Sequence, residues 1–129
     1  MKVLVLSNAE LKEKEIKNTL EDLQQIVGGY IEIPFLSKVF FENEIDVIIN
    51  EEGKLIDGLK PEIAVVKDGT NQILDVVYGN VIFASHDEEG NTTALNDKQM
   101  KVVVEQLKVE TMLHNGKENK THLVKVLFI

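Results

Sequence analysis

The feature that most constrains the fold is a series of short apolar runs, rich in valine and isoleucine, with glycine and polar residues between them. Runs of this length and composition are typical of β-strands. Lys67–Asn71 contains an Asp-Gly pair, which predicts a tight hairpin turn, and the run at 44–50 is expected to return through Leu55 and Ile56. Strands are expected at 2–6, 30–36, 44–50, 63–66, 73–77, 81–84 and 121–129, with a charged edge strand at 12–16.

The first of two expected helices covers residues 19–27 and ends at a pair of glycines. Asn18 or Thr19 can cap its first turn. A phosphate-binding loop needs its glycines before a helix, because the free amides and the positive end of the helix dipole lie there. Gly28 and Gly29 follow the helix instead, so they are expected to stop it rather than to bind an anion.

The second expected helix starts at a capping box formed by Asn96 and Gln99, and it covers residues 97–110. With the strands it predicts a single α+β domain over residues 1–113, a largely antiparallel sheet of about six or seven strands with two helices packed on it. Residues 114–129 are expected to form a C-terminal extension ending in a strand. Because that strand is apolar, it should pair with the main sheet or with a second copy, which allows a homodimer through it.

Charge argues against several classes of partner. The chain has 22 acidic against 14 basic residues, a net charge of −8, and every basic residue is a lysine. Arginine makes the bidentate contacts to phosphate and guanine, so its absence and the acidic balance argue against direct nucleic-acid binding and against an anionic membrane surface. Codon bias in an A·T-rich genome is nevertheless the stronger explanation of the missing arginine.

The chain contains no cysteine, which excludes disulfides and thiolate chemistry and is typical of a reducing cytoplasm. Its first residues include no apolar run long enough for a secretory signal or a membrane span. We therefore expect a soluble, cytoplasmic protein.

No pattern of catalytic or metal-binding residues stands out. His86 and Asp87 are neighbours, but with no nucleophile or third ligand at an informative spacing they are expected to be solvated loop residues. Asn50–Ile56 is similar to part of a calcium loop, yet the first carboxylate and the bidentate glutamate are missing, which favours a β-turn. We expect no catalytic residue, no metal and no cofactor.

Several segments together resemble a family of small domains, the domain-of-unknown-function family DUF3846. They are NTLEDLQQIVGGYIE at 18–32, NEEGK at 50–54, DVVYG at 75–79 followed by VIF at 81–83, and LNDKQ at 95–99. The resemblance covers residues 1–110, and it departs from the family at Pro61–Ile63, where members often carry a polar triplet such as Pro-Asn-Arg. Members are frequently encoded by phages, plasmids and other mobile elements. The resemblance therefore implies an origin more than an activity.

Small acidic proteins of such origin often antagonise host machinery by binding. The first functional hypothesis is a non-catalytic protein that inhibits a host defence or nucleic-acid enzyme through an acidic surface, with candidate contacts Glu42, Glu44, Glu51, Glu52, Asp87, Glu88 and Glu89. The alternative is a protein that sequesters a small ligand or nucleotide signal in a pocket near Tyr30, Asn50 and Tyr78. An enzyme is the least favoured hypothesis.

Overall fold

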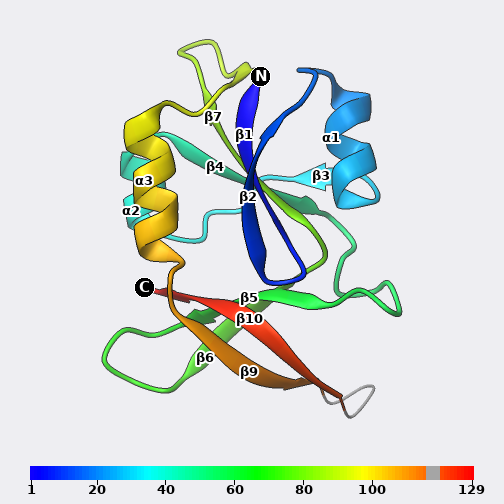
Figure 1. Cartoon of the computed structure of the whole chain (residues 1–129), viewed down its shortest axis with the longest axis vertical. Helices are drawn as coiled ribbons and strands as arrows, with labels where there is room; N and C mark the ends of the chain where they lie inside the picture. Colours follow the sequence, from blue (N-terminus) through cyan, green and yellow to red (C-terminus); the bar gives the residue numbers. More distant parts are fainter. Residues whose placement is uncertain (116–119) are drawn as a thin grey trace.

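The computed structural model describes residues 1–115 and 120–129 and shows an α+β fold with two sheets (Figure 1). Among these residues, the first sheet has six strands in the order β2-β1-β7-β4-β3, and β8 also pairs with β7. Each of these pairs is antiparallel. The strands are β1 (Lys2–Ser7), β2 (Glu10–Glu15), β3 (Ile31–Glu32), β4 (Ile45–Asn50), β7 (Val81–His86) and β8 (Thr92–Thr93).

The second sheet has the order β6-β5-β10-β9. It consists of β5 (Pro61–Val66), β6 (Ile73–Tyr78), β9 (Glu110–Asn115) and β10 (Lys120–Phe128). β10 runs parallel to β5, whereas the other two pairs are antiparallel. The expectation of one sheet was therefore wrong, because the apolar pattern of a strand does not specify which distant strand it pairs with.

After β4 the chain leaves the first sheet and enters the second. The expected return strand at Leu55 and Ile56 is absent from the described residues, where 51–58 form turns instead. The amide of Gly53 donates to the carbonyl of Asn50 at 3.1 Å, which closes the first of these turns. The next strand is β5, which starts the second sheet, and its hairpin with β6 across Lys67–Gln72 confirms the turn predicted from the Asp-Gly pair.

Three helices lie among the described residues, one more than expected: α1 (Leu20–Val27), α2 (Lys38–Glu42) and α3 (Asp97–Gln106). For α1, the Thr19 hydroxyl accepts from the amide of Asp22 at 3.2 Å, and Gly28 ends the helix with a φ of 84°. For α3, the capping box at Asn96 is confirmed. α3 nevertheless stops at Gln106, before the predicted end, because the following segment from Glu110 forms β9.

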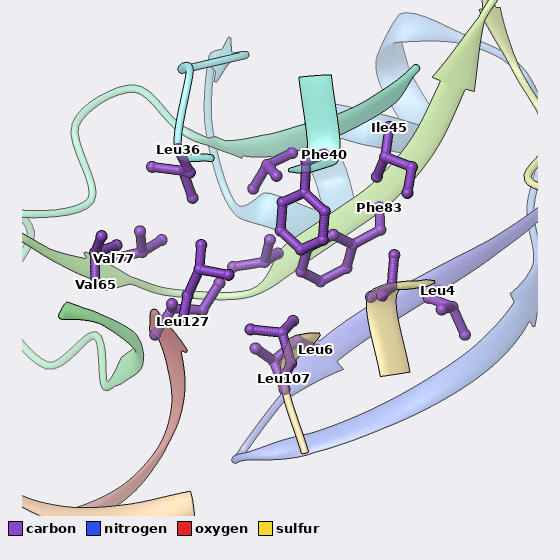
Figure 2. Packing of buried hydrophobic residues seen from close by; sticks show 14 of the residues in the cluster. Leu4, Leu6, Leu36, Phe40, Ile45, Val65, Val77, Phe83, Leu107 and Leu127 are labelled. Atoms are coloured by element: carbon purple, nitrogen blue, oxygen red, sulfur yellow. The ribbon is translucent and has the colours of Figure 1, made fainter. Parts of the chain in front are cut away.

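The two faces of the first sheet are covered differently (Figure 1). α1 packs on one face, over alternate residues of β1 and β7. On the other face, α2, α3 and the second sheet share one core. Figure 2 shows the rings of Phe40 and Phe83 next to each other. Their centroids are 5.8 Å apart, and the rings meet edge to face. The labelled members of this core are Leu4, Leu6, Leu36, Phe40, Ile45, Val65, Val77, Phe83, Leu107 and Leu127.

The expected C-terminal strand is confirmed as β10, and its neighbours lie within the chain. It is an interior strand of the second sheet, with β5 on one side and β9 on the other. Residues 116–119 of the expected extension lie outside the described residues. The division into a domain and an extension, and a homodimer through this strand, stay predictions.

Candidate functional site

The segment between β3 and β4 builds an unusual surface. Pro34 cannot donate a ladder hydrogen bond, which suits the end of β3 after Glu32. The chain then stays irregular until Ser37, whose hydroxyl accepts from the amide of Phe40 at 3.0 Å and caps α2. Leu36 and Phe40 are buried, and both contribute to the core shared by the two sheets. These two anchors fix the segment while its remaining apolar residues face outward.

Two outward residues form an exposed aromatic pair. Phe35 is 69% exposed and Phe41 is 70% exposed, and their ring centroids lie 5.6 Å apart with an angle of 54° between the planes. Ile33, at 48% exposure, lines the same hollow as this pair, and Val39 of α2 is also exposed, at 38%. We call Ile33, Phe35 and Phe41 the aromatic surface. Contiguous exposed apolar side chains of this kind mark interaction sites in many proteins.

Sequence reasoning missed the aromatic surface. In the run IPFLSKVFF at 33–41, buried and exposed apolar residues alternate too irregularly for strand or helix periodicity to separate them. A usable signal was the Pro34…Ser37 spacing, in which a proline breaks the strand and a serine can cap a short helix. A five-residue helix after Ser37 places Phe40 toward the core and leaves Phe41 outside.

A hollow of about 250 Å³ lies beside the aromatic pair. Its walls include Phe35, Phe40 and Phe41, and its polar groups include Asp46 from β4 and His86 from β7. The Nδ1 atom of His86 lies 3.1 Å from each carboxylate oxygen of Asp46. The Asp46 side chain is 18% exposed and that of His86 38% exposed, so the pair is partly open to solvent. His86 therefore has its contact on the neighbouring strand and is not simply a solvated loop residue.

The acidic candidates divide into two groups at opposite ends of β4. Glu42 and Glu44 precede β4, and the loop with Asp87, Glu88 and Glu89 follows β7, whose end pairs with the start of β4. All five are exposed, and the two segments that carry them flank the place where the start of β4 pairs with the end of β7. The remaining two candidates, Glu51 and Glu52, follow the other end of β4, and this strand is itself about 17 Å long at the usual rise per residue.

Within the first group, Asp87 has a local structural task. Its carboxylate accepts from the amides of Glu89 at 3.0 Å and Asn91 at 2.9 Å. The amide bond to Asn91 is the main cause of a pKa below the ordinary value for this carboxyl, and the side chain of Asn91 and the amide of Glu89 lower it further. Asp87 thus shapes its loop, whereas Glu88 and Glu89 extend from it into solvent.

Asn50, a candidate ligand residue, lies at a buried junction. It is 4% exposed, and its amide nitrogen donates to the carbonyl of Val27 at 3.2 Å. Its side-chain oxygen accepts from the amide of Glu52 at 2.8 Å. The amide of Glu51 donates to the carbonyl of Tyr30 at 2.8 Å. The side chain of Asn50 therefore joins the end of α1 to the turn after β4.

Two glycines make this junction possible. A Cβ at Gly29 would lie 3.0 Å from the side-chain nitrogen of Asn50. A Cβ at Gly53 would lie 2.7 Å from the carbonyl oxygen of Tyr78, closer than such atoms can approach. The segments VGGY, NEEGK and DVVYG thus meet at one place, and we call it the Asn50 junction. Its glycines are required for close approach of the chain and not for binding an anion.

A second hollow, of about 310 Å³, borders the Asn50 junction. Asn50 and Tyr78 line it together with Glu52, Lys54 and Asp75, and Lys54 forms an ion pair with Asp75. The side chain of Tyr30, the third candidate ligand residue, is 71% exposed. The structure therefore brings Asn50 and Tyr78 to one hollow, and Tyr30 contributes its backbone nearby.

A buried carboxylate connects the two sheets at another point. Glu62 of β5 is 2% exposed and accepts from the amides of Asn8 at 2.9 Å and Ala9 at 2.8 Å. Asn8 and Ala9 form the two-residue turn of the β1–β2 hairpin, with φ angles of 53° and 61°. Burial raises the pKa of the Glu62 carboxyl, although these amides and the charges of Lys60 and His122 oppose the rise.

No group of three or more His, Asp or Glu side chains in the described part of the chain is arranged to hold a metal ion. Within residues 1–115 and 120–129, no helix has the length and apolar character that crossing a membrane requires.

The comparisons with known proteins identify a family. No curated protein and no solved structure matches the chain. The family model for a domain of unknown function, DUF3846, matches residues 1–108. This range includes both sheets' strands up to β8, the three helices, the Asn50 junction and the aromatic surface. Because the match spans most of the 129 residues, the chain belongs to the DUF3846 family.

Proposed function

We propose that this protein is a non-catalytic binding domain whose partner is another protein, and that the aromatic surface is the centre of the contact. The observation that carries the proposal is the pair Phe35 and Phe41, each about 70% exposed and 5.6 Å apart. Leaving two adjacent phenylalanines in water is unfavourable, and aromatic side chains are enriched at the centres of protein interfaces. Their anchors, Leu36 and Phe40, hold the surface in place before a partner arrives.

Carboxylates form one side of this surface. Glu42 and Glu44 follow the aromatic pair in the chain, and Glu88 and Glu89 lie on the adjoining loop. Charges at the rim of an interface mainly increase the association rate and select the partner, while buried aromatics supply most of the affinity. We therefore assign these four residues to the rim. Glu51 and Glu52, at the other end of β4, belong to a different part of the surface.

In this proposal the protein is of phage or mobile-element origin, and its binding inhibits a host defence or nucleic-acid enzyme. A net charge of −8 supports it, because enzymes that hold nucleic acid present basic surfaces to which a carboxylate-rimmed patch is complementary. Origin, inhibition and partner are all part of the proposal.

The test is a comparison of three tagged baits in a lysate of cells that carry the gene, with captured proteins quantified by mass spectrometry. The baits are the native chain, Phe35→Ser/Phe41→Ser, and the matched control Leu20→Ser/Val104→Ser, which removes two apolar residues that are 54% and 50% exposed on α1 and α3. We expect the native and control baits to capture the same stoichiometric partner and the phenylalanine variant to lose it. Equal capture by all three baits would contradict the proposal.

A second candidate function is binding of a small ligand. The observation that favours it is that two predicted residues, Asn50 and Tyr78, line the same hollow of about 310 Å³. A pocket of that size is at the lower end of those that enclose small molecules, about 300 to 1,000 Å³. Any such ligand would raise the melting temperature by mass action. A screen of nucleotides and metabolites against the native chain and Tyr78→Phe would reveal it, and an unchanged melting temperature throughout would remove this alternative. Catalysis is the least favoured of the three functions.

A further inference from the structure

We propose that the hollow beside the aromatic pair is a recognition pocket for one arginine side chain of the protein partner. This inference rests on the proposed protein-binding function and names the chemistry of the contact. The hollow combines aromatic walls, from Phe35 and Phe41, with a partly exposed carboxylate, Asp46. Aromatic faces attract cations and a carboxylate pairs with them, so the two kinds of group favour the same occupant.

The carboxylate of Asp46 can accept further hydrogen bonds besides its contact with His86. Its contact with His86 uses one ring nitrogen, placed 3.1 Å from both oxygens. An ionised carboxylate has about four lone-pair sites, so it retains acceptor capacity for the N–H groups of a guanidinium. Because 18% of its side chain is exposed, a group that enters the hollow can reach it without unfolding the strand.

The charges around the hollow also favour a cation. Glu42 ends α2 and Glu44 precedes β4; both are exposed, and each is next in the chain to a residue that lines the hollow. Lys38, on the same helix, lies 3.6 Å from Glu42 and is 82% exposed, so its charge is largely offset and screened by solvent. An anionic occupant such as a phosphate would meet the carboxylate of Asp46, which lines the hollow, and Glu44 is next in the chain to the lining residue Ile45. A protein side chain is therefore a better occupant than a nucleic acid.

Size and shape select arginine. The volume of about 250 Å³ is smaller than most small-molecule pockets, and it suits a single long side chain. A guanidinium is planar, stacks on aromatic rings and is less strongly hydrated than an ammonium, so it enters an aromatic hollow at lower cost than lysine. This chain contains no arginine. The occupant must therefore come from a different protein and not from a second copy.

The test is a titration of the isotope-labelled native chain with the peptide acetyl-Gly-Arg-Gly-amide, followed by backbone amide shifts in NMR spectra. Two matched peptides replace the arginine. One carries citrulline, which keeps the planar shape but has no charge, and the other carries lysine, which keeps the charge but has no planar guanidinium. We expect shifts at Phe35, Phe41, Asp46 and His86 with the arginine peptide, weaker ones with lysine and none with citrulline. A millimolar site is well occupied at about 20 mM peptide, so no shift at that concentration would overturn the proposal.

Two substitutions sharpen the result. Asp46→Asn keeps the shape and an acceptor for His86, and Phe41→Leu keeps an apolar wall; each should weaken arginine binding about fivefold. Asp75→Asn, the same change in the other hollow, should leave binding of the arginine peptide unaltered. Equal binding of citrulline or lysine, or shifts centred on Asp75, would overturn the arginine assignment.

The two proposals can fail separately. If the arginine peptide does not bind but partner capture still depends on Phe35 and Phe41, the pocket assignment fails and the binding function stands. If the peptide binds as expected but partner capture does not depend on Phe35 and Phe41, the pocket exists and the proposed function fails.

Discussion

The Asn50 junction and the aromatic surface are neighbours, because the hollows beside them share two lining residues, Pro34 and Leu36. At the junction, the polar side chain of Asn50 is buried and hydrogen-bonded at both ends. At the surface, the rings of Phe35 and Phe41 are exposed and their centroids lie 5.6 Å apart. In this chain, three of the segments that carry the family resemblance meet at the Asn50 junction and hold the scaffold together, whereas the proposed binding surface lies outside them.

The largest expected effect is at Gly53, where an added Cβ meets backbone. Gly53→Ala should lower the free energy of unfolding by about 3 kcal/mol, because the carbonyl of Tyr78 must move away from it. Urea unfolding measures the loss. Gly29→Ala is the matched variant: its obstacle is the Asn50 side chain, which can adjust, so a smaller loss of about 1 kcal/mol is expected. A larger loss at Gly29 than at Gly53 would contradict this description of the junction.

The next effect comes from removing the Asn50 side chain. Asn50→Ala should cost about 2 kcal/mol, because the carbonyl of Val27 and the amide of Glu52 both lose their partner. Asn18→Ala is the control, since Asn18 donates to the carbonyl of Thr92 in an exposed bond and should cost no more than about 0.5 kcal/mol. Similar losses in both variants, measured by urea unfolding, would mean that Asn50 is not a structural hub.

A smaller effect, and one that depends on pH, is expected at Glu62. Its pKa in the folded state lies above the ordinary value of 4.5, so the folded state binds the proton more tightly than the unfolded state. The stability from this group is therefore fully present below pH 4.5 and is lost as pH rises through the raised pKa. Glu62→Gln removes the titration. The stability of the native chain relative to this variant should fall between pH 4 and pH 7.

Urea unfolding of both proteins across that pH range gives the comparison. Glu15 and Asp87, whose pKa values are lowered, titrate in both proteins, so their contributions cancel. A native chain that gains stability over the variant as pH rises would show that the amides of Asn8 and Ala9 outweigh burial and lower the pKa of Glu62.

Local signals predicted much of the fold. The cap at Thr19, the stop at Gly28, the capping box at Asn96 and the Asp-Gly hairpin each depend on residues within one turn of each other, and all are present. The second sheet was missed because it depends on the parallel pairing of β10 with β5, which are far apart in the chain. α2 was missed because five residues are too few to show helical periodicity.

The candidate site was harder to predict for a related reason. Acidic residues could be chosen by type, but only the fold separates Glu42 and Glu44 from Glu51 and Glu52 by the length of β4. Phe35 and Phe41 were not singled out from the sequence, because their exposure depends on which neighbouring residue takes the core position. Here Leu36 and Phe40 take it.

The most direct test of the central claim is the free energy of unfolding of the Phe35→Ser/Phe41→Ser variant in urea. If these two residues form a binding surface and do not support the fold, the loss should be no more than about 1 kcal/mol, the worth of an exposed aromatic pair. A loss of about 3 kcal/mol or more is typical of a phenylalanine in a core. That result would contradict the proposal, because the two rings would then stabilise the fold and would not form a separate binding surface.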